Sequence, residues 1–443
     1  MVKTMERKLR FLFIDHYALN IGDMAILLGM VYLFSKVFSN SEIIIESTHP
    51  KITKKILNRY EFNEVKVIPR LIYIDKCRAH RIDSLHYITH IKNIKCYLLL
   101  LLKLFTAILA SMIFKITKTS SLLPRTLRMY VNSDCIISVG GGFLNEYYGW
   151  ILRTITYSLI KIFYQKPIIL FCQSIGPFSS NFSKKIVRIV LNSMIDIIII
   201  RDKKSIEWLK QMDICMSKVY LGVDCGIAIK NLMEDRDYIS TKENSNSYIR
   251  VGITVRDFFK DRKSYNHFIK EISRVINKIL CQYFNESRKC TLIFIPHDPS
   301  DKKMFMDIMS HLKEKRKYVR SYNYSEDPMK VINGYKNLDI VIAMRFHSII
   351  FSAITRTPVI SIACEEKSTD LMRRMGLEQY VFKLDDVMNN VEKIYYAINK
   401  MLMKENYTEV VKKIKKSVKN FEEILDICIN LIVAFTEQKR KKT

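Results

Sequence analysis

The stretch Asp339–Ile354, D-I-V-I-A-M-R-F-H-S-I-I-F-S-A-I, predicts a short strand, a turn and a helix in immediate succession. Its apolar run Ile340–Ala343 is rich in β-branched residues, which is typical of a buried strand. A short turn containing Arg345 and His347 follows, and the apolar segment Ser348–Ile354 predicts a helix. A continuous apolar strand that leads into a helix indicates a parallel sheet covered on both faces.

Similar apolar runs recur along the whole chain, with helical stretches between them, and we expect each run to form a strand. The runs of the first half are Arg10–Ile14, Glu42–Glu46, Val65–Ile68, Cys135–Val139, Ile168–Cys172, Ile197–Ile200 and Val219–Leu221. Those of the second half are Ile249–Thr254, Leu292–Ile295, Val319–Tyr322, Ile340–Ala343 and Val359–Ile362. Strands and helices that alternate in this way predict two doubly wound α/β domains with right-handed crossovers.

The polar segment 234–247 separates the two series of strands. It lacks apolar periodicity, and its polar composition is typical of a linker. We therefore expect an N-terminal domain over residues 1–233 and a C-terminal domain over residues 248–443. The helical pattern near the end of the chain, residues 406–438, is assigned to the second domain. In such folds, ligands bind at the carboxyl ends of the strands, in the cleft that the two domains face.

The composition favours an anionic partner but does not identify it. The 443 residues carry a formal net charge of +28, which attracts nucleic acid, acidic lipid or phosphorylated substrates. The ten cysteines form no C-x-x-C pair, which excludes zinc-ribbon and thioredoxin-type sites and favours reduced thiols. The apolar run Phe11–Ile14 is too short for a signal peptide, so we expect a cytoplasmic protein.

The apolar segment Tyr97–Phe114 is interrupted only by Lys103 and has basic residues on both sides. Three interpretations remain open for it. It forms a buried or partly buried helix of the first domain, it lies in the surface of an anionic membrane, or it spans the membrane. A peripheral position at the inner membrane face follows from the second interpretation.

Two loops of the first domain have the composition of ligand-binding turns. In the segment Asn20–Asp23, Gly22 permits a sharp turn and Asp23 either caps the following helix or contacts an acceptor. The triplet Gly140, Gly141 and Gly142 is expected to expose backbone N–H groups at a helix start, where an anion is held. Neither G-x-G-x-x-G nor a Walker sequence is present, so no dinucleotide or ATP site is supported.

Arginine and histidine follow several strands directly. Arg201 comes after Ile197–Ile200 and is expected to bind an anion, the alternative being a surface ion pair with Asp202. Arg256 and Arg345 occupy comparable positions in the second domain. His347 opens a helix, and histidine is the residue type whose pKa is most easily tuned near neutral pH, which suits an acid catalyst. Two further candidates also follow strands: Gln173 and His297.

These segments together resemble the polysaccharide pyruvyl transferase family. The matching segments are Asn20–Leu27, Ser138–Leu144, Gln173–Phe178, Ile199–Ser205, Val251–Arg256, Ile295–Asp298, Asp339–Ile354 and Pro358–Ala363, followed by Lys367. The resemblance implies two Rossmann-like domains of glycosyltransferase-B type. It also implies transfer of pyruvate from phosphoenolpyruvate to a sugar, usually as a cyclic ketal. The chain departs from the family pattern at Phe346, where the family usually has Leu, and at Cys364–Glu366.

What the resemblance implies agrees with the chemistry of the residues. Phosphoenolpyruvate carries a carboxylate and a phosphate, so its site needs several cations, and His347 would protonate C3 of the donor. The expected donor-binding residues are Arg201, Arg256, Arg345, Lys367, Gly140, Gly141 and Gly142. The expected acceptor-binding residues are Asn20, Asp23, Asn145, Glu146 and His16. The acceptor is a saccharide, free or lipid-linked. No metal and no cofactor besides the co-substrate phosphoenolpyruvate are expected, since no metal-ligand spacing occurs.

Two other function classes compete with this interpretation. A glycosyltransferase that uses a nucleotide sugar would have the same fold. A non-enzymatic protein that binds nucleic acid or membrane would explain the charge. Because the chain lacks an RNA-binding aromatic motif, zinc spacing and a basic recognition helix, no nucleic-acid partner is expected.

Overall fold

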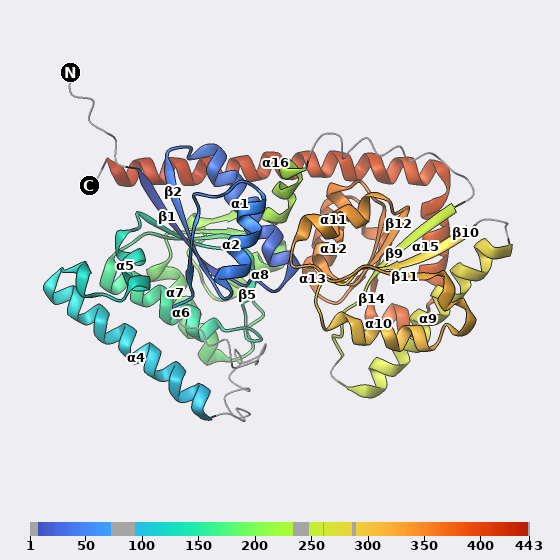
Figure 1. The fold of residues 1–443 in the computed structure, drawn as a ribbon, viewed down its shortest axis with the longest axis horizontal. Coiled ribbons are helices and arrows are strands. Elements are labelled where there is room, and N and C mark those ends of the chain that lie inside the picture. The colour runs from blue at the N-terminus through green and yellow to red at the C-terminus, as the bar shows by residue number, and fades with distance from the viewer. Residues whose placement is uncertain (1–7, 72–93, 234–247, 260, 286–288, 442–443) are drawn as a thin grey trace, which may run out of the picture. The chain divides into compact units, whose positions relative to one another are not determined.

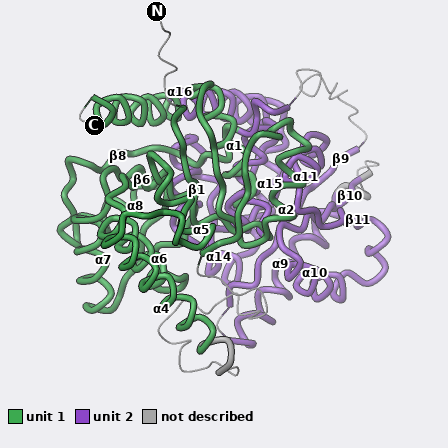
Figure 2. The backbone as a smooth tube through the Cα atoms, turned by 60° about the vertical axis from the view of Figure 1, so that its left-hand side comes forward, with its two compact units in different colours: residues 1–19, 23–228, 424–443 green, residues 20–22, 229–423 purple. Residues whose placement is uncertain are grey.

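The computed structural model describes residues 8–71, 94–233, 248–259, 261–285 and 289–441. The chain forms two compact α/β units (Figures 1 and 2). Unit 1 comprises Met1–Leu19, Asp23–Ala228 and Ile424–Thr443, and unit 2 comprises Asn20–Gly22 and Ile229–Glu423. The expected linker, 234–247, lies outside the described residues.

Unit 1 contains a parallel sheet of eight strands. Its order is β3-β2-β1-β4-β6-β7-β8, and β5 pairs with β6 beside this path. The strands are β1 Leu9–His16, β2 Ser41–Ser47, β3 Lys66–Pro69, β4 Cys135–Ser138, β5 Gly141–Leu144, β6 Ile168–Ile175, β7 Ile197–Ile200 and β8 Val219–Leu221. The helical elements are α1 Ile21–Val37, α2 Pro50–Arg59, α4 Ile94–Thr117, η1 Ser120–Leu122, α5 Arg125–Asn132, α6 Trp150–Leu159, η2 Ile160–Tyr164, α7 Asn181–Met194, α8 Lys203–Gln211, η3 Met216–Lys218 and η4 Cys225–Leu232.

Unit 2 contains a parallel sheet of six strands in the order β11-β10-β9-β12-β13-β14. The strands are β9 Tyr248–Thr254, β10 Lys289–Phe294, β11 Val319–Ser321, β12 Ile340–Ala343, β13 Val359–Ala363 and β14 Val381–Lys383. The helical elements are α9 Arg262–Asn285, α10 Asp301–Ser310, η6 Lys313–Tyr318, α11 Pro328–Lys336, α12 Phe346–Ile354, α13 Glu366–Arg374, η7 Glu378–Tyr380, α14 Leu384–Asn389, α15 Glu392–Leu402 and α16 Lys404–Arg440.

Alternate residues of the unit 1 strands fill two different cores, because successive side chains of a strand point to opposite faces. Leu12 and Ile14 of β1 belong to a buried cluster that also contains residues of α5, α6 and α7. Phe11 and Phe13 point to the other face, where their rings lie 5.2 and 4.9 Å from that of Phe34 in α1. The central strands are therefore covered on both sides, as the continuous apolar runs predict.

The predicted fold class is confirmed, and every expected strand is present. Two short strands, β5 and β14, were not predicted. The expectation that Gly140–Gly142 opens a helix is wrong: β5 follows, and α6 begins only at Trp150. Asp23 is not the helix cap either, since α1 begins at Ile21 and the side-chain oxygen of Asn20 accepts the N–H of Gly22 at 2.9 Å.

The C-terminal helix α16 contributes to both units, whereas the sequence assigned it to the second domain. Its residues up to Glu423 group with unit 2, and Ile424–Thr443 group with unit 1. Glu422 forms an ion pair with Lys230 at 2.7 Å, and Lys439 lies 4.0 Å from the carboxylate of Asp196. A helix of 37 residues is about 55 Å long, so its two ends can belong to different cores.

Helix α4 includes the apolar segment that the sequence left with three interpretations. Within the part of the chain that the structure describes, Leu98–Thr117 is the one helical stretch long and apolar enough to cross a membrane, and only 11% of it is buried. The helix is thus not a core helix, and it packs against unit 1 along one stripe that includes Ala107 and Ser111.

Candidate active site

The strand order of unit 2 changes direction between β9 and β12, which is the point where doubly wound sheets bind ligands. β9 ends at Thr254 and β12 ends at Ala343. Arg256 follows the first strand, and Arg345 and His347 follow the second. The structure therefore brings three of the predicted site residues to one edge of one sheet.

Arg345 is held by groups from two neighbouring loops. Its Nε–H donates to the carbonyl oxygen of Val255 at 3.4 Å, and its guanidinium forms an ion pair with the buried carboxylate of Asp301. Asp301 also accepts the backbone N–H of His297 at 3.0 Å. Because Arg345 is itself the N-cap residue of α12, these contacts fix the start of that helix.

The carboxylate of Glu365 lies between two of the predicted donor-binding cations. Its Oε2 is 2.6 Å from Arg256 and 3.1 Å from Lys367. Lys367 also lies over the ring of Phe346, 5.5 Å from its centroid. Burial opposes ionisation of Glu365, but Lys367 and Arg256 hold its pKa low, at about 2. The two cations thus share one carboxylate, that of Glu365.

His347 is the second residue of α12 and lies beside this cluster. Its ring is 5.3 Å from that of Phe346 and 6.3 Å from that of Phe351. A Cβ atom on Gly22, which groups with unit 2, would lie 1.9 Å from Nδ1 of His347. The glycine of the Asn20–Asp23 turn therefore leaves the space that the histidine ring fills.

A chain of buried hydrogen bonds supports the residue next to His347. Nε2 of His297 is 2.8 Å from the hydroxyl of Tyr335, which donates to Ser348 at 2.9 Å. Burial lowers the pKa of His297 well below its usual value, and Arg345 and His347 lower it further. His297 is therefore neutral and buried, so it is suited to positioning α12 rather than to proton transfer.

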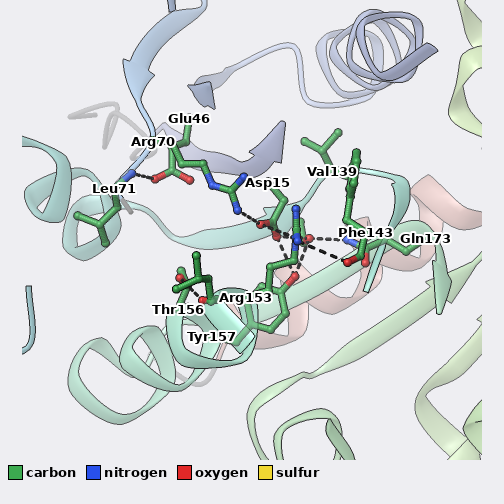
Figure 3. A network of polar contacts seen from close by, with 12 residues as sticks. Asp15, Glu46, Arg70, Leu71, Val139, Phe143, Arg153, Thr156, Tyr157 and Gln173 are labelled. Atoms are coloured by element: carbon green, nitrogen blue, oxygen red, sulfur yellow. Dashed lines mark hydrogen bonds and ion pairs between the residues drawn. The ribbon is translucent and has the colours of Figure 1, made fainter. Parts of the chain in front are cut away.

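Unit 1 has the same change of strand direction between β1 and β4. Asp15, near the end of β1, forms ion pairs and hydrogen bonds with residues from several elements (Figure 3). Its carboxylate is 3.1 Å from Arg70 and 3.2 Å from Arg153, and it accepts the hydroxyls of Ser138 at 2.7 Å and Tyr157 at 2.8 Å. Burial raises the pKa of Asp15, but the two arginines and the two hydroxyls lower it more, so the group stays ionised.

Glu46 and His16 flank this network and are both buried. Glu46 accepts the hydroxyl of Tyr130 at 2.8 Å and the N–H of Leu71, yet burial raises its pKa to about 7. Burial, together with Arg70 and His49, lowers the pKa of His16 to about 3. His16, a predicted acceptor residue, is thus a neutral, fully buried imidazole.

The glycine triplet and Gln173 lie at the same edge of the unit 1 sheet. A Cβ atom on Gly140 would come within 3.0 Å of the carbonyl oxygen of Cys172, so this glycine serves close packing. Gly141 and Gly142 begin β5, and Gly141 pairs with Gln173. The side-chain NH2 of Gln173 donates to Ser138 and to the carbonyl of Val139 at 3.2 Å, which joins it to the Asp15 network.

Arg201 is buried in unit 1 and is bound to neighbouring residues. Its guanidinium forms an ion pair with Asp224 at 2.5 Å, both side chains being 2% exposed, and its Nε–H donates to Ser174 at 2.8 Å. Asp202 caps α8 by accepting the N–H of Ser205 at 2.9 Å. The alternative of an exposed Arg201–Asp202 surface pair is therefore wrong. Binding of an anion by Arg201 stays a prediction.

The predicted acceptor residues Asn145 and Glu146 stabilise turns. Asn145 donates to the carbonyl of Gly142 at 2.8 Å and accepts the N–H of Tyr147 at 2.8 Å. Glu146 accepts the N–H of Ser180 at 2.8 Å and the hydroxyls of Ser179 and Ser183. Partial burial raises its pKa, but the serine hydroxyls outweigh this and lower it to about 2.

Several residues of these networks were missing from the sequence prediction. Asp15 and Glu46 stand near the ends of predicted strands. The criterion that selected Arg201, a charged residue at the end of an apolar strand, therefore applies to them too. In the sequence, Glu365 stands out only as a departure from the family pattern. Arg153 and Tyr157 lie within α6, and no sequence signal connects them with Asp15.

The sequence model of the polysaccharide pyruvyl transferase family matches residues 20–366. This stretch covers more than half of the chain and includes Arg201, Arg256, Arg345 and His347, whereas Asp15 and His16 precede it. The chain belongs to the polysaccharide pyruvyl transferase family. Membership makes it a transferase with a role in polysaccharide modification.

Within the described residues, no group of three or more His, Cys, Asp or Glu side chains could hold a metal ion.

Known proteins agree with this family assignment and with the fold. The chain is 22% identical to the amylovoran biosynthesis protein AmsJ of Erwinia amylovora, over 93% of this chain and 95% of that protein. A crystal structure of Anabaena HepE with UDP and glucose matches with a TM-score of 0.58 and 10% identity, covering 97% of this chain and 100% of that one. A putative UDP-N-acetylglucosamine 2-epimerase from Listeria monocytogenes matches with a TM-score of 0.60 and 12% identity, covering 97% and 98%. At these identities the solved structures support the two-unit, glycosyltransferase-B type fold alone.

Proposed function

We propose that this member of the pyruvyl transferase family transfers pyruvate from phosphoenolpyruvate to a sugar of a cell-surface polysaccharide or of its lipid-linked precursor. The product is a cyclic ketal across two sugar hydroxyls. The observation that carries the proposal is the cluster at the switch point of unit 2, where Arg256 and Lys367 share the carboxylate of Glu365. A donor with two anionic groups requires such a concentration of cations.

The donor would bind by displacing the carboxylate of Glu365 from the two cations of this cluster. Its carboxylate or phosphate takes the place that Glu365 holds between Arg256 and Lys367. Arg345 lies at the same edge and adds a third cation. The sequence also predicts that Arg201, Gly140, Gly141 and Gly142 contact the donor, and for these residues of unit 1 the role remains a prediction.

The reaction proceeds by two additions at C2 of the donor. His347 gives a proton to C3, positive charge develops at C2, and the first sugar hydroxyl forms a C2–O bond while losing its proton. The C2–O bond to phosphate then breaks and inorganic phosphate leaves with the bonding electrons. The second hydroxyl attacks C2, loses its proton and closes the ketal. The starting double bond is replaced by a methyl group, so no oxidation or reduction takes place.

The acceptor is predicted to contact unit 1. The sequence-based candidates are Asn20, Asp23, Asn145, Glu146 and His16. Because acceptors of this kind are made inside the cell, we propose a cytoplasmic location. No cofactor besides phosphoenolpyruvate is proposed.

The test is donor-dependent phosphate release. Purified protein is incubated with phosphoenolpyruvate and with free or lipid-linked oligosaccharides, and phosphate and acceptor mass are both measured. Phosphate release that requires an acceptor, with a pyruvate-sized gain in acceptor mass, supports the proposal. UDP-glucose in a parallel arm tests the nucleotide-sugar alternative. Hexose transfer from UDP-glucose, with no use of phosphoenolpyruvate, would refute the proposal.

A further inference from the structure

We infer that α4 docks unit 1 onto an anionic membrane surface, with the helix lying parallel to the bilayer plane. The inference rests on the exposed apolar face of α4, on the anchoring of its opposite face, and on the charge around it. It concerns a surface separate from the candidate active site and does not depend on the donor.

One face of α4 is apolar and exposed. Leu98, Leu102, Phe105, Leu109, Met112 and Ile116 follow one another at intervals of four and three residues, which places them along a single stripe. Their side chains are strongly exposed, with Phe105 at 63% and Ile116 at 82%. A continuous apolar stripe of this kind marks an interaction surface rather than a solvated one. We call these six residues the α4 stripe.

The opposite face of α4 is fixed to the folded unit. The hydroxyls of Ser111 and Tyr164 are hydrogen-bonded at 2.6 Å, and the ring of Phe114 lies 5.7 Å from that of Tyr164. Ala107 is buried in the unit 1 core. A helix anchored in this way cannot be surrounded by lipid on all sides. The protein occupies the side that would be the polar face of an ordinary interfacial helix, so the exposed apolar side chains of α4, which include the α4 stripe, are available to the bilayer.

The charge around α4 selects an anionic surface. From Ile94 to Ser133 the sequence contains no Asp or Glu. The same stretch contains Lys95, Lys103, Lys115, Lys118, Arg125 and Arg128. Lys115, Lys118 and Arg125 are exposed and lie in or shortly after the C-terminal part of α4. Basic side chains next to an apolar stripe that enters the bilayer bind anionic headgroups.

The same charge disfavours a second copy of the chain as the occupant. The spacing of the α4 stripe would suit helix pairing, since coiled coils use this repeat. Two copies of α4, however, would bring only basic residues together, with no acidic partner on either helix. Like charges at flanking positions oppose association, so the bilayer is the partner that the observations favour.

Flotation with vesicles tests the inference. Full-length protein is mixed with vesicles of phosphatidylcholine alone or with 30% phosphatidylglycerol, and the bound fraction is measured at low and high salt. We expect at least about 10-fold stronger binding to the anionic vesicles, reduced by salt because the Debye length falls. No binding to anionic vesicles would overturn the inference, and equal binding to both vesicle types would overturn the role of charge.

Matched variants locate the surface. The variant Leu102→Gln, Phe105→Gln, Leu109→Gln should lose at least about 10-fold in binding. The control Ile189→Gln, Met306→Gln, Ile427→Gln changes equally exposed apolar residues outside α4 and should bind like the wild type. The variant Lys115→Gln, Lys118→Gln, Arg125→Gln should lose binding to anionic vesicles. Its control, Lys185→Gln, Lys210→Gln, Lys416→Gln, removes three exposed lysines outside α4 and should bind like the wild type.

Sedimentation without vesicles separates the two occupants. A dimer that dissociates in the stripe variant and does not bind vesicles would show that a second copy covers α4, and would contradict the inference. Since no donor or acceptor is present in these assays, their failure would leave the proposed pyruvyl transfer unaffected, and the reverse also holds.

Discussion

Glu365 and Arg256 form an ion pair, with 2.6 Å between Oε2 and the guanidinium nitrogen. The pair joins the loop after β9 to the start of α13, and Lys367 shares the same carboxylate oxygen at 3.1 Å. An anionic donor that uses Arg256 and Lys367 must compete with this carboxylate. Glu365 is therefore expected to set the apparent affinity for the donor.

Glu365→Gln should lower the KM for phosphoenolpyruvate about 3- to 10-fold, which corresponds to about 1 kcal/mol. The amide keeps the size of the side chain but removes the competing charge. Glu366→Gln is the matched control, because Glu366 is the next residue and is exposed. A higher KM in Glu365→Gln would show that Glu365 orients the cations for the donor instead of competing with it.

Arg256→Lys should raise the KM for phosphoenolpyruvate, because lysine keeps the charge but cannot form two planar hydrogen bonds. Steady-state kinetics with phosphoenolpyruvate measure this change, and an unchanged KM would contradict it.

Arg201→Lys should chiefly reduce stability, by about 1–3 kcal/mol, since Arg201 and Asp224 form a buried pair. Urea unfolding measures the stability of the Arg201→Lys variant, and steady-state kinetics measure its KM for phosphoenolpyruvate. If Arg201→Lys raised KM and left stability unchanged, the donor role predicted from the sequence would be supported.

Tyr335→Phe should lower kcat about 5- to 10-fold with little change in the KM for phosphoenolpyruvate. The substitution removes the hydroxyl between His297 and Ser348, so the start of α12 and the adjacent His347 lose support. Tyr395→Phe, which removes a hydrogen bond to Gln282 elsewhere in unit 2, is the control. Equal kinetics of Tyr335→Phe and wild type would rule out this positioning role.

The contribution of Glu46 to the free energy of unfolding should fall as pH rises through the titration range of this group. The pKa of Glu46 is raised by burial to about 7, above its ordinary value of 4.5. Between these values Glu46 binds more protons in the folded state than in the unfolded state, so its stabilising contribution is fully present below pH 4.5 and is lost as pH rises to 7. Glu46→Gln should remove up to about 3 kcal/mol of this pH dependence. Urea unfolding at several pH values measures it, and parallel curves for both proteins would contradict the assignment.

The sequence predicted the sheets well because each strand is a short apolar run with its own local signal. Ile197–Ile200 and Ile340–Ala343 match β7 and β12 residue for residue. The strands β5 and β14 were missed because Gly-Gly-Phe-Leu and Val-Phe-Lys carry weak strand signals. Parallel pairing with β6 and β13 forms them, and this tertiary contact is invisible in a local pattern.

The candidate site was predictable only where a residue directly follows a strand. Arg256, Arg345 and His347 meet this condition, and the topology brings them to one edge. The pairing of Arg345 with Asp301, and of Arg256 with Glu365, depends on how separate loops fold together. Spacing in the sequence gives no indication of these partners, so the counter-ions of the site were found only in the structure.

The most direct test of the central claim is transfer of 13C-labelled pyruvate from phosphoenolpyruvate to an oligosaccharide acceptor by the wild type and by His347→Ala. We expect a labelled ketal and one phosphate per pyruvate in the wild type. In folded His347→Ala we expect a rate lower by about 10²–10⁴-fold, with binding of phosphoenolpyruvate largely retained. Near-normal transfer by His347→Ala would contradict the assigned acid, and the absence of any label on the acceptor in the wild type would contradict pyruvyl transfer itself.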